Sequence, residues 1–290
     1  MRRHNFIIIL LLLFTFIQLS SIKQSENSVN LAISDSTQIQ ILTVNDGSSF
    51  IGRIIEIGSE KIKFHTKYGV MTIPVFEITD LKLVSENQLK DGKYWFPNPN
   101  CSRLFFAPTG RMLKQGEGYF ADYFIFFPTV NYGVTSNFSI GGGFSILPGE
   151  DLDEQVLLFT PKVGIKTSAK MDLAIGALVV KLPEEISSLG ILYGVSTFGS
   201  LDKSITVGLG LGYAEDKFVD KPMIVLGGEI RTSRNLSLVT ENWLVPEKDT
   251  PILSAGFRFF GEKLSADFAL IFPLEDDVLV FPYIDFVYKF

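Results

Sequence analysis

Residues 204–213 of the 290-residue chain, SITVGLGLGY, carry the clearest structural pattern in the sequence. Apolar side chains occupy every second position and small residues stand between them: Ile205, Val207, Leu209, Leu211 and Tyr213 alternate with Ser204, Thr206, Gly208, Gly210 and Gly212. A period of two is typical of a β-strand, because successive side chains point to opposite faces of the sheet. This strand is therefore predicted to have one apolar face and one face of small residues.

The same alternation recurs in residues 138–147, 253–259 and 264–272, and helical periodicity is almost absent from Ser102 to Phe290. A soluble β-sandwich would turn its apolar face inward and cover its outer face with Lys, Glu and Thr. Here the polar face is rich in glycine, which has no side chain to pack. Glycine suits a crowded interior and the apolar face suits lipid, so the pattern predicts an antiparallel transmembrane β-barrel.

Connection lengths alternate between short and mostly longer, as the periplasmic turns and outer loops of such barrels do. The short connections are residues 135–137, 167–169, 199–202, 232–234 and 261–262, and the longer ones are 148–154, 183–188, 214–221, 246–250 and 274–277. With short turns on the periplasmic side, the strand that ends at Val134 needs a preceding strand of opposite direction. We assign Arg103–Leu113 to it, which predicts a barrel of about twelve strands over residues 101–290.

The last strand, residues 278–290, ends the chain on an aromatic residue. One of its faces carries Val280, Ile284, Phe286, Tyr288 and Phe290. This pattern resembles the C-terminal recognition strand of bacterial outer-membrane proteins, which their assembly machinery reads. The resemblance implies that Tyr288 and Phe290 form an assembly signal and that the partners are outer-membrane lipid and the barrel-assembly machinery.

The N-terminus has the order of a secretory signal peptide: Arg2 and Arg3, then an apolar run from Phe6 to Ile17, then small and polar residues. The apolar run is shorter than the roughly 20 residues that span a bilayer. We therefore expect a cleaved signal peptide over residues 1–23, export to the bacterial outer membrane, and a disordered lead over residues 24–37.

Residues 38–84 contain five short apolar segments separated by turn residues, which predicts a small β-barrel. The Asp46-Gly47 turn, the stretch Phe50–Ile54, and the pairs Tyr68-Gly69 and Ile73-Pro74 resemble Sm-like and SH3-like barrels. The module has no basic stripe, so we expect it to contact a periplasmic protein or its own neighbour rather than RNA. Residues 85–100, with Asp91-Gly92, Pro97 and Pro99, are predicted to form a linker.

A second resemblance covers residues 95–150. It rests on Asn98-Pro99-Asn100 with Ser102-Arg103, Pro108-Thr109, the stretch Gly116–Phe120, and the stretches 131–134 and 138–143. These residues resemble a group of uncharacterised bacterial outer-membrane barrel proteins. The resemblance implies the compartment and the fold, and it implies no activity.

Composition excludes several classes of protein. With 46% hydrophobic and 20% charged residues, the chain is not a disordered one. Its formal net charge of −6 argues against binding to nucleic acid, which depends on clustered positive charge. The single cysteine, Cys101, has no partner for an intrachain disulfide and no second cysteine or nearby histidine for a zinc site. We expect no cofactor and no metal site.

Enzymatic activity is not expected either. The two histidines are His4, in the signal peptide, and His65, in the small module. Catalysis by Ser-His or Asp-His pairs needs a histidine base, and the sequence places none between Ser102 and Phe290.

Charged residues of both signs fall on the face predicted to line the lumen. The candidate lining residues are Lys162, Asp172, Glu229, Arg231, Glu241, Arg258, Asp267 and Asp285. Such a set can be a salt-bridged filling or the wall of a narrow hydrophilic channel, and a count of about twelve strands permits both. The leading hypothesis is a non-enzymatic outer-membrane barrel, either a narrow pore or a structural element with a periplasmic partner-binding module. The alternative is a soluble periplasmic lipocalin-like protein with its apolar face inside.

Overall fold

The structure is a computed structural model that describes residues 29–35, 38–149, 151, 154–182, 188–214, 217–245, 250–274 and 279–290. The predicted signal peptide lies outside these ranges, as does the predicted lead apart from residues 29–35. The chain divides into two compact units between Trp95 and Phe96. Within the described residues, no helix is long and apolar enough to cross a membrane.

The first unit is a five-stranded antiparallel sheet in the order β4-β3-β2-β1-β5. Its elements are β1 Gln38–Val44, β2 Ser49–Ile57, β3 Lys61–Thr66, β4 Gly69–Pro74, the 3-10 turn η1 Val75–Glu77, and β5 Ile78–Ser85. The core contains Leu42, Ile54 and Phe64, and Val29 and Leu31 pack against it. Within the described residues 29–35 of the lead, Val29 and Leu31 are therefore held on this core, whereas Ile33 is exposed. The likeness of this unit to SH3-like or Sm-like barrels stays a prediction.

The segment predicted to be a linker, residues 85–100, has structure along its length. It contains the 3-10 turn η2 Glu86–Gln88 and a two-stranded hairpin of β6 Leu89–Lys90 and β7 Lys93–Tyr94. Asp91 and Gly92 form its turn with φ angles of 50° and 69°. Residues 96–100 belong to the second unit. The Gly and Pro signals read as a linker thus mark a tight hairpin turn and the start of the second unit.

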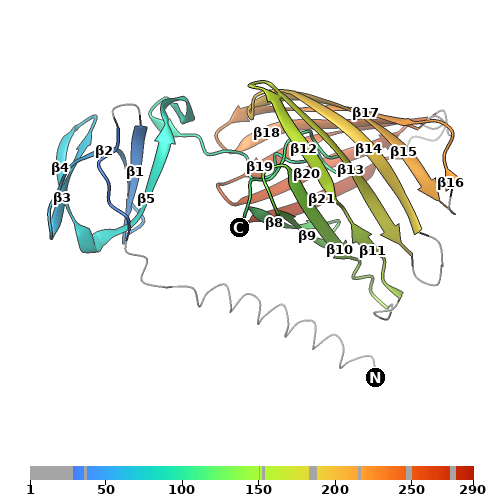
Figure 1. The fold of residues 1–290 in the computed structure, drawn as a ribbon, viewed down its shortest axis with the longest axis horizontal. Helices are drawn as coiled ribbons and strands as arrows, with labels where there is room; N and C mark the ends of the chain where they lie inside the picture. Colours follow the sequence, from blue (N-terminus) through green and yellow to red (C-terminus); the bar gives the residue numbers. More distant parts are fainter. Residues whose placement is uncertain are drawn as a thin grey trace. The chain divides into compact units, whose positions relative to one another are not determined.

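The second unit is a closed antiparallel β-barrel of twelve strands (Figure 1). Its strands are β8 Gly118–Tyr123, β9 Phe127–Gly133, β10 Phe138–Phe144, β11 Leu157–Phe159 with β12 Lys162–Ser168, β13 Met171–Lys181, β14 Ser188–Gly199, β15 Lys203–Ala214 with the short β16 Lys217–Phe218, β17 Met223–Ser233, β18 Leu236–Val245, β19 Thr250–Phe260, β20 Leu264–Pro273 and β21 Phe281–Lys289. The segments β11 and β12 follow one another between β10 and β13, and the pairing of β21 with β8 closes the wall. The predicted all-β antiparallel barrel is confirmed.

The predicted first strand is wrong, although the predicted number of strands is right. Arg103–Leu113 is not part of the wall, and the segment read as one strand ending at Val134 is the hairpin of β8 and β9. This hairpin turns at Phe124 and Ile125, whose φ angles are 53° and 70°. Bulky residues rarely adopt such left-handed conformations, so residues 124–125 carry no recognisable turn signal.

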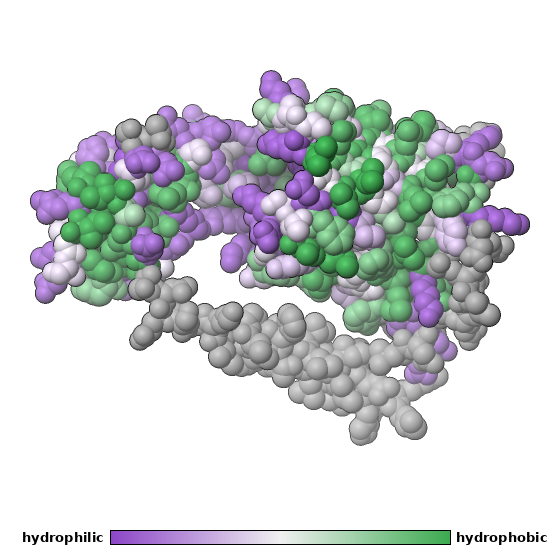
Figure 2. All heavy atoms as spheres, in the orientation of Figure 1, coloured by the Kyte–Doolittle hydropathy of each residue, from purple (hydrophilic) through white to green (hydrophobic). Residues whose placement is uncertain are grey.

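Large apolar side chains cover the outside of the barrel. Ile205 and Leu209 on β15 are 57% and 55% exposed, whereas the side chain of Thr206 between them is fully buried and points inward. Figure 2 shows apolar residues spread over the barrel strands on the visible face. The apolar face is therefore outside, the reverse of the lipocalin-like alternative.

Candidate functional site

The lumen of the barrel contains a segment of the chain itself. Residues 98–113, here called the inner segment, fold back on themselves: Leu104 N–H donates to Ala107 C=O at 2.8 Å and Thr109 N–H donates to Ser102 C=O at 3.0 Å. Leu104 and Phe105 are each only 1% exposed. The part of the sequence assigned to a linker and a first strand is thus the filling of the lumen.

Arg258 on β19 holds the inner segment to the wall. Its guanidinium donates to both carboxylate oxygens of Asp267, at 2.8 and 2.7 Å, and to Glu229 Oε2 at 3.1 Å. It also donates to the carbonyl oxygens of Asn100, at 2.8 Å, and Leu104, at 2.6 Å. A buried charge is tolerated only where such partners replace water. Three of the predicted lining residues therefore form one network.

The inner segment contributes polar side chains to the same network. Asn98 Nδ2 donates to Glu229 Oε1 at 2.7 Å, and Asn100 Nδ2 donates to Asp267 Oδ2 at 3.3 Å. These asparagines belong to the motif that resembled uncharacterised outer-membrane barrels. Their role inside the lumen was not predicted.

Glu241 on β18 holds the tip of the inner segment. Its Oε2 accepts hydrogen bonds from the backbone N–H groups of Phe105, Phe106 and Ala107, at 2.9, 2.9 and 3.0 Å, and its Oε1 accepts one from Trp243 Nε1 at 2.7 Å. Successive N–H groups that converge in this way form an anion-binding nest. The carboxylate of Glu241 has a structural role, since each hydrogen bond that it accepts from the inner segment comes from a backbone N–H group.

Arg103 forms a second link between the inner segment and the wall. Its guanidinium makes a hydrogen-bonded ion pair with Asp285 on β21 and lies 4.5 Å from the centre of the Tyr123 ring. The Tyr283 hydroxyl donates to the carbonyl oxygen of Phe105 at 3.0 Å. Arg103 was predicted to lie in a wall strand and was therefore not among the predicted lumen residues.

The remaining three candidate residues lie apart from this network. Lys162 Nζ donates to the carbonyl oxygens of Ser102, at 3.2 Å, and Arg111, at 2.7 Å. Asp172 Oδ2 is 3.8 Å from Arg111 Nε. Arg231 lies next to the short turn after β17, where it pairs with Asp202 at 3.1 Å and donates to the carbonyl oxygen of Phe96 at 2.9 Å.

Glycines of the wall make room for the inner segment. A Cβ on Gly227 would lie 2.5 Å from Leu104 Cδ1 and 2.4 Å from the carbonyl oxygen of Thr240. The converse holds at Gly110 of the inner segment, where a Cβ would lie 2.2 Å from the carbonyl oxygen of Asp172 in the wall. The inward glycines were predicted to line a crowded interior. At Gly227 the neighbouring side chain is Leu104 of the inner segment.

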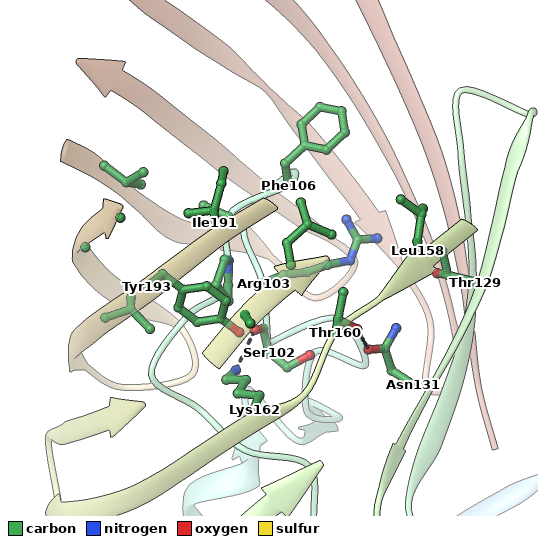
Figure 3. A pocket seen from close by; sticks show the side chains of 18 of the residues that line it. Ser102, Arg103, Phe106, Thr129, Asn131, Leu158, Thr160, Lys162, Ile191 and Tyr193 are labelled. Atoms are coloured by element: carbon green, nitrogen blue, oxygen red, sulfur yellow. Dashed lines mark hydrogen bonds between the residues drawn. The ribbon is translucent and has the colours of Figure 1, made fainter. Parts of the chain in front are cut away.

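A cavity of about 490 Å³ lies in the lumen on the side of the long connections (Figure 3). We call it the chamber. Arg103 and Phe106 of the inner segment line it together with wall residues that are mostly apolar, among them Leu158, Leu178, Ile191, Tyr193, Val195 and Val225. The chamber was not predicted from the sequence. Residues 177–180 and 191–192 could have indicated it, because consecutive apolar residues there make the inward face of the strand apolar as well as the outward one.

The C-terminal strand β21 ends beside the start of β8. Phe290 and Gly118 exchange two backbone hydrogen bonds, of 2.9 and 3.1 Å, and Lys289 Nζ lies 3.0 Å from Glu117 Oε2. Burial would raise the pKa of Glu117, but the hydrogen bond and charge of Lys289 outweigh it, so the pKa lies below its usual value. Tyr288 and Phe290 are exposed on the outside of the barrel.

Comparisons with known proteins give structural likeness only. No protein-family profile and no curated protein matches the chain. Among solved structures, it is similar to the KdgM porin in complex with disordered oligogalacturonate, with 5% identity over 60% of this chain and 98% of that one and a TM-score of 0.46. It is also similar to a loop-deletion mutant of OmpT, an outer membrane protein of Vibrio cholerae, with 10% identity over 88% of this chain and 97% of that one and a TM-score of 0.35. A mutant of the Rh. blastica porin matches with 10% identity over 87% of this chain and 97% of that one, with a TM-score of 0.34.

Proposed function

We propose that the chain is a non-enzymatic β-barrel of a bacterial outer membrane whose lumen is closed by its own inner segment. The apolar outer surface supports the membrane part of this proposal. A contiguous apolar surface around a whole barrel is unfavourable in water and favourable in the hydrocarbon of a bilayer. The signal-like N-terminus and the aromatic C-terminal strand agree with that location.

The observation that carries the closure is the attachment of the inner segment to the wall on several sides. Barrels of about 8 strands are filled by side chains, and those of 16 to 18 leave an aqueous channel. A barrel of twelve strands has an intermediate cross-section. Here Arg258, Glu241 and Asp285, on β19, β18 and β21, bind the inner segment from one side of the barrel. Lys162 on β12 binds it from another side. The barrel is thus a narrow pore that conducts only when this segment is displaced.

The chemistry of the buried charges supports a non-enzymatic role. The carboxylates of Glu229, Asp267 and Asp285 are paired with arginine, and that of Glu241 is held by backbone amides. Groups used in this way hold the inner segment in place. Within the described residues, no cluster of His, Cys, Asp and Glu could hold a metal ion.

We also place the N-terminal module in the periplasm. Phe96, where the second unit begins, packs its ring against Phe260 at the short-turn end of the barrel, with 6.1 Å between ring centres. Short turns face the periplasm in outer-membrane barrels, so the chain leaves the barrel on that side. Exposed apolar residues on the module, among them Tyr68, Val70 and Phe76, support a contact with a periplasmic protein.

Membrane extraction and bilayer recordings together test the proposal. We expect the protein to stay in the membrane during alkaline carbonate extraction, to migrate differently on a gel before and after boiling, and to show rare or no conductance steps in a planar bilayer. Release by carbonate and an unchanged gel position would indicate the soluble lipocalin-like alternative. Steady open steps from an inserted barrel would contradict the closure.

A further inference from the structure

The chamber has the shape and chemistry of a ligand site, which the closed-barrel role does not require. We propose that it binds a single-chain amphiphile with an anionic head group, with the chain among the apolar wall residues and the head at Lys162. This inference rests on the barrel fold but not on ion conduction.

The inward faces of two neighbouring strands change from polar to apolar toward the long connections. On β13 the inward residues run from Asp172 through Ala174 to Leu178, and on β14 they run from Thr197 through Val195 to Ile191. An aqueous channel would keep polar side chains along its whole length. The chamber wall therefore favours an apolar guest over water or a sugar.

The chamber is also of a size that holds a ligand. Its volume of about 490 Å³ falls within the range of roughly 300–1,000 Å³ that is typical of small-molecule sites. The tyrosines Tyr119, Tyr123 and Tyr193 line it as well. A mostly apolar pocket with a few polar groups is the usual form of such sites.

Lys162 supplies the positive charge for the head group. It is 8% exposed and lines the chamber, and Figure 3 shows it beside Ser102. An ammonium group has three donors, and two of them are used by the carbonyl oxygens of Ser102 and Arg111. Among the described residues, no carboxylate lies within ion-pair distance of Lys162. A buried charge without a counter-ion is costly, and an anionic ligand would supply one.

Two further polar atoms of residues that line the chamber have no hydrogen-bond partner within the described part of the chain. They are Ser102 Oγ and Arg103 Nε, which are buried and belong to residues that line the chamber. Buried donors without partners are rare in folded proteins. The floor of the chamber therefore offers hydrogen-bond donors next to a positive charge, which is the recognition chemistry of a carboxylate or similar anion.

The test uses the tryptophan that lines the chamber as a reporter. In a Trp95→Phe variant of the full chain in lipid nanodiscs, Trp243 is the sole tryptophan. The probes are ω-bromoundecanoate and the uncharged ω-bromoundecanol, whose bromine quenches indole fluorescence. We expect saturable quenching of Trp243 by the carboxylate. Gly208→Phe, where a Cβ has space, should fill the chamber and weaken the binding of both probes at least about tenfold. The matched control Val207→Phe lies on the outer face and should change neither.

Lys162→Met tests the position of the head group. It should weaken the carboxylate about tenfold, as expected for the loss of one charge-assisted hydrogen bond, and leave the alcohol unchanged; Lys162→Arg should retain carboxylate binding. Equal weakening of both probes by Lys162→Met would overturn the head-group assignment. Quenching that does not saturate, or that is unaffected by Gly208→Phe, would overturn the site. Failure of the barrel itself is read separately, from loss of the heat-dependent gel shift.

Discussion

The guanidinium of Arg258 bonds the barrel wall and the inner segment at once: it donates to Asp267 at 2.8 and 2.7 Å and to the carbonyl oxygen of Leu104 at 2.6 Å. Strand register contributes to this arrangement. Arg258 on β19 stands directly opposite Asp267 on β20, and Asp267 stands directly opposite Asp285 on β21. The filling of the lumen is therefore held by residues that also join three neighbouring strands.

Arg258→Met should destabilise the barrel strongly. It leaves the carboxylates of Glu229 and Asp267 buried without their main counter-charge, and breaking a buried pair in this way costs about 3–5 kcal/mol. Denaturant unfolding followed by gel mobility measures the change. The double variant with Asp267→Leu should recover part of the loss. Single and double variants of equal stability to the wild type would contradict the assigned role of the network.

Gly227→Ala should destabilise the protein more than Gly208→Ala. The added Cβ at Gly227 meets Leu104 and the carbonyl oxygen of Thr240 within 2.5 Å, whereas at Gly208 the nearest atom is 3.4 Å away. Overpacking of this kind typically costs about 1–3 kcal/mol. The same unfolding assay compares the two variants, and equal effects would show that the inner segment does not press against Gly227.

The ion pair of Glu117 and Lys289 should contribute to stability in a pH-dependent way. Because the folded-state pKa of Glu117 is lowered, its contribution is complete above the unfolded pKa of about 4.3 and is lost as the pH falls through the folded value. Glu117→Gln should therefore differ from the wild type at pH 7, by less than about 1 kcal/mol given the exposure of the pair. The difference should shrink in acid, and a difference that grows there would contradict this sign.

Phe290→Ala should impair assembly in cells without preventing refolding in detergent. The Phe290 side chain is exposed on the outer face, whereas its backbone pairs with Gly118 and is kept by the substitution. Comparison of heat-shifted protein in membranes and in refolding reactions measures both effects. An equal loss in the two settings would assign Phe290 a purely structural role.

The alternation in residues 204–213 was enough to predict the barrel and the direction of its apolar face. In a barrel strand, successive side chains point to opposite sides of the wall. Large apolar residues at alternate positions, such as Ile205 and Leu209, therefore identify the outward face. The same alternation of inward and outward positions predicted that Arg258, Asp267 and Glu229 face the lumen.

The inner segment could not be predicted from local sequence. Its conformation is set by Arg258, Glu241 and Asp285, which lie more than a hundred residues away along the chain. The turn at Phe124 and Ile125 was missed because a positive φ in bulky residues has no compositional signal. The chamber depends on both, since it is the space that remains between the wall and the inner segment.

Single-channel conductance of Glu241→Ala beside the wild type tests the closure of the lumen most directly. The substitution removes the acceptor that holds the backbone amides of Phe105, Phe106 and Ala107, and Asp220→Ala, at an exposed position, is the matched control. The closed barrel predicts rare steps from the wild type and from Asp220→Ala, and frequent steps from Glu241→Ala. Steady, identical steps from all three proteins would contradict a lumen closed by the inner segment.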